Sequence, residues 1–141
     1  MMKEKLAENR KNQSLTGLKR ELAELTTLYE ISKAINSSLD LEVITKGVMK
    51  ILHEQMGMER GTLTLLDSRT GHLIIEVAHG LAKEEIGRGR YRVGEGITGK
   101  VVEAGEPIVV PNVGDEPLFL NRTRSRGDIK RSNISFICVP I

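Results

Sequence analysis

The chain has 141 residues, of which 39% are hydrophobic and 28% are charged, and its formal net charge is +2 at pH 7. These values are typical of one globular domain that is large enough to bury a core. The nearly balanced charge argues against a general nucleic-acid binder, because a basic face usually dominates the charge of such proteins. The single cysteine, Cys138, excludes internal disulfides and is typical of a reducing compartment.

The N-terminus indicates neither secretion nor a membrane anchor. No apolar run approaches the roughly 20 residues that cross a bilayer. The first residues, MMKEKLAENRKN, lack the apolar stretch of a signal peptide. We therefore expect a cytoplasmic protein without membrane contact, in which residues 1–14 form a charged, disordered lead.

A heptad pattern predicts a signalling or dimerisation helix over residues 15–36. Its apolar residues recur at spacings of 3, 4, 3 and 4, and they are Leu15, Leu18, Leu22, Leu25 and Tyr29. Such a seam is typical of a coiled coil and predicts a homodimer through this helix. Two heptads also fit one amphipathic helix that packs wholly on its own sheet.

The remaining pattern predicts an α+β domain over residues 37–141. Its expected form is a central antiparallel sheet with helices packed on one face. Ser38 or Asp40 is suited to cap the second helix. The predicted elements are a helix at 41–56, a β-hairpin at 61–77 with its loop at 67–71, a helical turn at 82–87, a strand at 90–93, a short helix at 97–104, and strands at 108–110 and 134–141.

Residues 94–99, GEGITG, match the G-x-G-x-x-G pattern of dinucleotide-binding proteins. The helix that follows is only about 12 Å long at 1.5 Å per residue, and Gly105-Glu106-Pro107 stops it. A parallel crossover needs a longer helix, in a unit of roughly 30 residues. We therefore interpret the pattern as structural and expect no nucleotide there.

In the structural interpretation each glycine has a backbone role. Gly94 and Gly96 permit positive φ, Gly99 lets the short helix pack closely, and Gly105 ends that helix. The inward-facing side chains of the helix are then Ile97, Val101 and Val102.

No catalytic or metal-binding constellation stands out. His53, His72 and His79 lack the spacing of metal ligands, and one cysteine cannot form a redox disulfide. No nucleophile and base are paired in the pattern, and no Walker-type phosphate loop occurs. We expect neither an enzyme nor a metal site.

Several segments together resemble a GAF domain, and more narrowly the GAF domain of NifA-like, sigma-54-dependent activators. The similarity extends over roughly residues 25–141, and it is carried by LYEIS, NSSLDLEVI, RGRYRVGEGITGKVVEAGEPIVVPNV, EPLFLNRTRSR and ISFICVPI. The resemblance implies a sensory domain that regulates a downstream AAA+ ATPase and makes no DNA contact itself. A GAF domain continues with another strand and a C-terminal helix, so the resemblance also implies that this chain ends before the domain does.

The arginine-rich loop after Phe119 is the candidate effector site. Guanidinium groups suit carboxylate or phosphate ligands, and some NifA-type GAF domains bind 2-oxoglutarate, which makes a small dianion the expected effector by resemblance. Its expected contacts are Phe119, Arg122, Arg124 and Arg126, with N–H groups at Ile97 and Thr98. The alternative is a ligand-free interaction domain that a NifL- or PII-type partner regulates.

Overall fold

The computed structural model describes residues 1–125 and 133–141, and within the first helix it describes no side chain at positions 3, 4, 6, 7 and 9–11. The chain forms two compact units, Met1–Glu59 and Arg60–Ile141. The two long helices lie in the first unit, and the strands and the shorter helices lie in the second.

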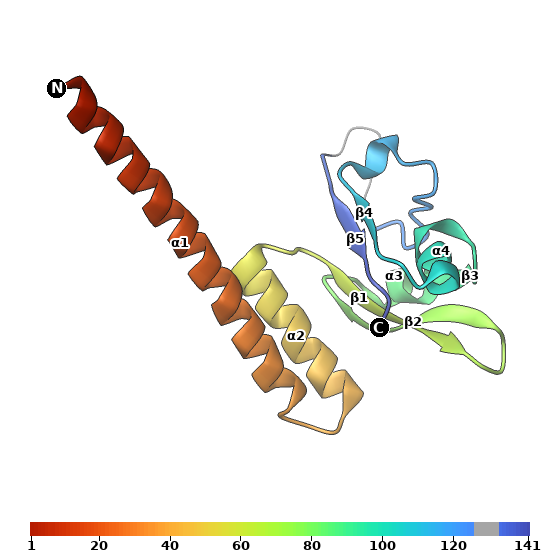
Figure 1. Ribbon diagram of the computed structural model, residues 1–141. Coiled ribbons are helices and arrows are strands. Elements are labelled where there is room, and N and C mark those ends of the chain that lie inside the picture. The colour runs from red at the N-terminus through yellow and green to blue at the C-terminus, as the bar shows by residue number, and fades with distance from the viewer. Residues whose placement is uncertain (126–132) are drawn as a thin grey trace. The chain divides into compact units, whose positions relative to one another are not determined.

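The first unit is a hairpin of two helices, α1 at Met2–Ile35 and α2 at Leu41–Met56 (Figure 1). The structure places the start of α1 at Met2, whereas we expected residues 1–14 to be a disordered lead. The reason lies in local propensity, because this lead contains many good helix formers and has no glycine or proline. Helix α2 has the predicted bounds.

Asp40 caps α2, one of the two residues predicted for that role. Its carboxylate accepts the N–H groups of Glu42 at 2.8 Å and Val43 at 3.3 Å. Ser38 supports this turn, since its hydroxyl oxygen accepts the Asp40 N–H at 3.0 Å. Such a cap satisfies two of the otherwise unpaired donors at a helix start.

Helix α1 packs on α2 through small and polar side chains. Thr27 is only 7% exposed; its hydroxyl donates to the Ala23 carbonyl at 2.9 Å and lies 3.3 Å from Oε1 of Gln55. Nearer the turn, a Cβ added to Gly47 would lie 3.6 Å from Cβ of Ala34. Because a helix has 3.6 residues per turn, the seam of Leu22 and its heptad partners lies roughly opposite this contact face.

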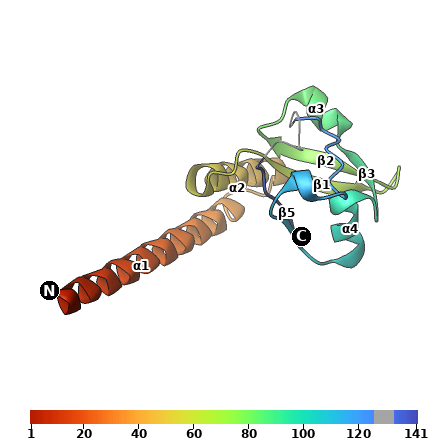
Figure 2. The ribbon, with the colours of Figure 1, turned by 90° about the horizontal axis from the view of Figure 1, so that it is seen from above.

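The second unit is built from antiparallel strands. One sheet has the order β1-β2-β3, with strands at Gly61–Asp67, His72–His79 and Arg90–Arg92 (Figure 2). A separate pair joins β4, Ile108–Val110, to β5, Phe136–Cys138. The helices of this unit are α3 at Lys83–Arg88, α4 at Gly96–Ala104 and a 3-10 turn at Val113–Asp115.

The α+β class and the antiparallel pairing are confirmed, and two details differ from expectation. The described strands divide between two sheets instead of joining one central sheet. The last strand, predicted over residues 134–141, pairs only over Phe136–Cys138. Its pairing with β4 joins Ile108 to Cys138, Val109 to Ile137 and Val110 to Phe136.

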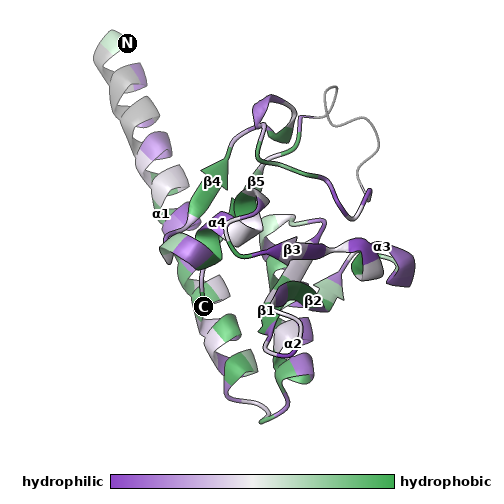
Figure 3. Ribbon diagram, turned by 90° about the vertical axis from the view of Figure 1, so that its right-hand side faces the viewer, coloured by the Kyte–Doolittle hydropathy of each residue, from purple (hydrophilic) through white to green (hydrophobic). Residues whose placement is uncertain are grey.

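The core of this unit lies between α4 and the β4–β5 pair. Ile97, Val101, Val110 and Val113 form a buried cluster, and Ile108, Phe119, Ile134, Phe136 and Cys138 pack against it. In Figure 3 the ribbon of β4 has the hydrophobic colour and lies beside α4. Val102 was expected to point inward but is 42% exposed. Positions 97 and 101 share one helix face, whereas 102 is turned about 100° further around.

The glycine interpretation of the GEGITG segment is confirmed. Gly94 and Gly96 have φ values of 81° and 61°, and Gly105, with φ 68°, ends α4. A Cβ at Gly99 would lie 2.2 Å from the Arg92 carbonyl oxygen and 3.0 Å from the Gly94 nitrogen. Only glycine fits at that position without movement of the backbone.

We predict that Gly99→Ala lowers the free energy of unfolding by about 1–3 kcal/mol, because the added methyl group forces α4 away from β3. Urea denaturation measures this change. Gly87→Ala is the matched control, since a Cβ there meets nothing within 4 Å. Equal unfolding free energies for the two variants would contradict the close contact.

Candidate functional site

The GEGITG segment satisfies several of its own backbone groups. The Gly94 N–H donates to the Gly99 carbonyl at 2.8 Å, and the Gly99 N–H donates to the Glu95 carbonyl at 3.0 Å. The Glu95 N–H donates to the Arg92 carbonyl at 3.0 Å. These three donors are therefore already used within the turn, whereas a phosphate-binding loop directs its N–H groups to the ligand.

Glu95 stands at the start of α4 and connects two neighbouring segments. One carboxylate oxygen, Oε2, accepts the Arg92 N–H at 2.8 Å. The other, Oε1, forms an ion pair with Nη2 of Arg122. Glu95 thus joins the end of β3 to the loop that follows Phe119.

Arg122 makes three contacts around β3. Besides the pair with Glu95, its Nη1 donates to the Arg90 carbonyl at 3.1 Å. Its guanidinium carbon lies 5.8 Å from the centroid of the Tyr91 ring, which is a cation–π distance. Burial raises the pKa of the Tyr91 hydroxyl, and the positive charge of Arg122 opposes that rise.

A second arginine holds the same loop. Arg88, at the end of α3, donates from Nε at 3.1 Å and from Nη2 at 2.6 Å to the Thr123 carbonyl. Between these anchors the backbone turns sharply: Asn121 and Arg124 have φ values of 45° and 54°. Residues 121–124 are therefore tied to both α3 and the start of α4.

An open depression of about 440 Å³ lies beside this ion pair. Its lining residues are His72, Arg90, Arg92, Glu95 and Arg122. His72 and Arg92 are direct partners in the β2–β3 register. The surface is therefore strongly polar, with arginine as its most frequent residue.

The residues predicted to contact the effector do not all lie at one surface: some belong to the core and others are exposed. Ile97 is 4% exposed and belongs to the core, and the ring of Phe119 packs edge-to-face on Phe136 with centroids 5.3 Å apart. Burial raises the pKa of the Cys138 thiol, and a hydrogen bond with the Thr98 side chain opposes that rise. Arg122 reaches the start of α4 and Arg124 is exposed, while Arg126 lies outside the described residues.

Sequence reasoning missed the contribution of β3 to this site. Arg90 and Arg92 alternate along the strand, so both side chains leave the same face of the sheet. That alternation was readable in the sequence. Their proximity to Arg122 could not be predicted from the sequence, because Arg122 lies 32 residues after Arg90 on a loop that folds back toward β3.

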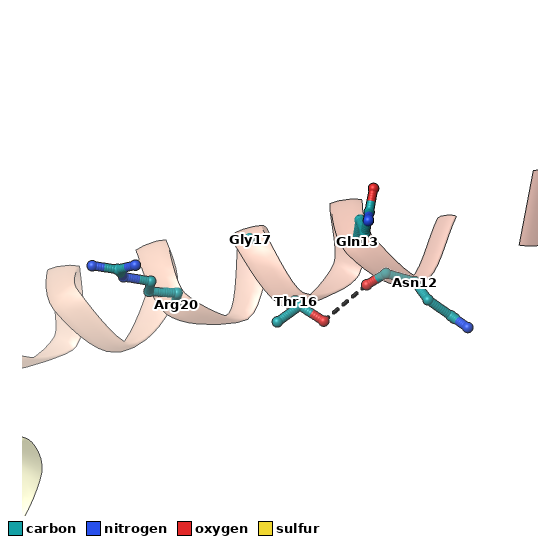
Figure 4. A pocket seen from close by; sticks show the side chains of 5 residues that line it. All are labelled: Asn12, Gln13, Thr16, Gly17 and Arg20. Carbon is teal, nitrogen blue, oxygen red and sulfur yellow. Dashed lines mark hydrogen bonds between the residues drawn. The ribbon is translucent and has the colours of Figure 1, made fainter. Parts of the chain in front are cut away.

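The N-terminal half of α1 carries a separate polar face. Asn12, Gln13, Thr16, Gly17 and Arg20 line a shallow surface there (Figure 4). The Thr16 hydroxyl donates to the Asn12 carbonyl at 2.8 Å, and Arg20 pairs with Glu24 at 3.0 Å. These contacts stay within one helix, so this face forms no enclosed pocket.

Two features are absent from the part of the chain that the structure describes. No helix in that part of the chain has the length and apolar character needed to cross a membrane. Nor do any three histidine, cysteine, aspartate or glutamate side chains described by the structure lie close enough together to hold a metal ion.

The second unit thus combines an α+β fold, a short helix after a glycine turn, and a loop that two arginines anchor. Residues 40–141 match the GAF domain family, and the chain belongs to it. The match begins at the residue that caps α2.

The chain is similar to regulators of nitrogen fixation. It is 47% identical to the nitrogen fixation protein VnfA of Azotobacter vinelandii over 118 residues, which cover 83% of this chain and 23% of that protein. It is also 47% identical to the Nif-specific regulatory protein of Herbaspirillum seropedicae, with 84% of this chain and 22% of that protein covered. The chain thus spans about a fifth of the length of these curated relatives.

Among solved structures, the chain is similar to the A. Aeolicus nlh2 GAF domain, crystallised in an inactive state. The identity is 29% and the TM-score is 0.66, with 77% of this chain and 66% of that chain covered. The family and the fold therefore agree.

We predict that Phe119→Ala lowers the free energy of unfolding by about 2 kcal/mol, less than the 3–5 kcal/mol typical of a fully buried phenylalanine, because this ring is only half-buried. Thermal or urea denaturation provides the measurement. Leu118→Ala, at a neighbouring side chain that is 39% exposed, serves as the control with a smaller expected loss. A Phe119→Ala protein as stable as the parent would contradict the placement of this ring in the core.

Proposed function

We propose that this chain is the sensory GAF domain of a NifA-like, sigma-54-dependent transcriptional activator in the cytoplasm. The observation that carries the proposal is the 47% identity to VnfA and to a Nif-specific regulatory protein, which extends over more than four-fifths of the chain. In this role the domain catalyses no reaction and contacts no DNA. It regulates an AAA+ ATPase domain elsewhere in the full-length protein.

We infer that α1 transmits the signal as part of a homodimer. The proposed interface is the heptad seam, whose side chains are 45–64% exposed: Leu15, Leu18, Leu22, Leu25 and Tyr29. Helix α2 packs on the Thr27 face and leaves this seam uncovered within the unit. A second copy would remove this apolar surface from water, at about 25 cal/mol per Å², through the geometry of a coiled coil.

We predict that Leu22→Glu and Leu25→Glu each shift the protein from dimer to monomer, because a charge at the seam would be buried without a partner. Light scattering coupled to size exclusion measures the mass. Gln13→Glu introduces the same charge on the polar face of α1 drawn in Figure 4 and should leave the dimer intact. Two leucine variants that remain dimeric would place the interface elsewhere.

We propose that the effector is a small dianion such as 2-oxoglutarate. Arg122 and Arg124 would bind its carboxylates, and the N–H groups at Ile97 and Thr98 would add donors at the start of α4. Support comes from the ion pair that already brings Arg122 to Glu95, the residue preceding this helix. Arg124 is exposed and available to a ligand.

A second candidate function has its own supporting observation. Phe119, Ile134 and Phe136 pack against Ile97 and Val101, so side chains of the chain itself occupy the inner face of α4. This packing favours a ligand-free interaction domain that a partner regulatory protein controls. The two candidates differ in whether a small molecule binds.

We predict that 2-oxoglutarate binds and that Arg122→Ala and Arg124→Ala each weaken it about tenfold or more, since each removes a charge-assisted hydrogen bond. Isothermal titration calorimetry provides the affinities. Arg69→Ala removes the same charge at an exposed turn and should change nothing. Absence of heat at millimolar ligand would contradict the effector and favour the partner-regulated function.

A further inference from the structure

We propose an additional anion site on the β2–β3 edge, formed by Arg90, Arg92, Arg122 and His72. It takes a small dianion that carries a phosphate or two carboxylates, and Glu95 acts as a built-in competitor for Arg122. Only the regulatory role of this site rests on the proposed sensory function. The site shares Arg122 with the effector contacts proposed above, but its other contacts come from β2 and β3 and not from residues 97, 98 and 124.

The strand register gathers these side chains. Arg92 lies directly opposite His72, and Arg90 lies opposite Ile74. Since alternate residues of a strand share a face, Arg90 and Arg92 leave β3 on the same side. Arg122 arrives from the loop and completes the lining of the 440 Å³ depression.

The charges in this depression are not balanced. Three guanidinium groups face one carboxylate, and that carboxylate is already paired with Arg122. Within the described part of the chain, the guanidinium groups of Arg90 and Arg92 have no carboxylate partner. A dianion supplies the missing charge, and guanidinium groups match phosphate and carboxylate oxygens in pairs of hydrogen bonds.

A hydrogen bond to the backbone orients the His72 ring, but His72 is not the main source of binding energy in this site. Its Nδ1 lies 2.9 Å from the Thr70 carbonyl, which can only accept, so this nitrogen holds a proton. That bond fixes the ring at the end of β2. The arginines therefore supply the charge, and His72 shapes the rim.

Glu95 makes the site responsive. Arg122 joins the loop at residues 121–124 to the start of α4 through Glu95, and to β3 through the Arg90 carbonyl. An anion that draws Arg122 away from Glu95 weakens that connection, while Arg88 still holds Thr123. Binding at β3 is thereby coupled to the attachment of the loop.

A small ligand fits this site better than a polyanion such as nucleic acid. The three arginines and Glu95 together carry a charge of +2 in the lining. A carboxylate inside the depression repels an extended chain of phosphates, whereas one dianion neutralises the site.

NMR titration of the whole chain with inorganic phosphate, and separately with malonate, tests the site at low ionic strength. We expect saturable shifts of the backbone amides between Arg90 and Glu95. Arg92→Gln should weaken binding about tenfold, because one charge-assisted pair is lost. Arg69→Gln, at the exposed turn, removes the same charge and should leave the affinity unchanged.

Glu95→Gln tests the competitor directly. The glutamine oxygen can still accept the Arg92 N–H, but its attraction for Arg122 is lost, so anion affinity should rise about tenfold. Glu84→Gln on exposed α3 is the control for the change in net charge. Equal effects of Glu95→Gln and Glu84→Gln would overturn the competition.

The two probes separate the sources of the anion. Binding of phosphate alone supports a phosphate ligand, and binding of malonate alone supports a dicarboxylate. Shifts that never saturate, or equal weakening by Arg92→Gln and Arg69→Gln, would overturn the site. That result leaves the 2-oxoglutarate proposal standing, because its distinguishing variant is Arg124→Ala.

Discussion

The close contact between α4 and the end of β3 is the constraint on which the second unit depends. Gly99 lies where a Cβ would come within 2.2 Å of the Arg92 carbonyl oxygen, and its own carbonyl accepts the Gly94 N–H at 2.8 Å. Because this contact fixes where α4 begins, it also fixes which helix face meets β4 and β5. Ile97 and Val101 enter the core as a consequence.

The contact between α4 and the end of β3 also determines where the charged groups outside the core lie. Glu95 leaves the turn between β3 and α4, so its carboxylate reaches both the Arg92 N–H and the Arg122 guanidinium. Arg88 holds the neighbouring Thr123 carbonyl from α3. A glycine pattern that resembles a cofactor fingerprint thus joins a packed core to an arginine-rich loop.

The features that depend on neighbouring residues, such as helix caps and glycine turns, could be predicted from the sequence. Asp40 was one of two predicted caps because it precedes an apolar periodic run, and Gly94 and Gly96 were recognised because positive φ is costly for other residues. The long-range contacts could not be predicted in this way. The packing of Phe119 on Phe136 was not foreseen when Phe119 was predicted as a ligand contact, and Arg90 was overlooked although its carbonyl accepts a hydrogen bond from Arg122. Both partners are distant in sequence.

The central claim is that the GEGITG turn is a folded structural element that needs no ligand. Amide hydrogen exchange of the ligand-free protein, followed by NMR, tests it most directly. We predict that the Gly94 and Gly99 amides exchange as slowly as those of Leu73 and Val101 in the core, because both donate within the turn and Gly99 is buried. Exchange at the rate of an open loop, with protection appearing only when a nucleotide is added, would contradict it.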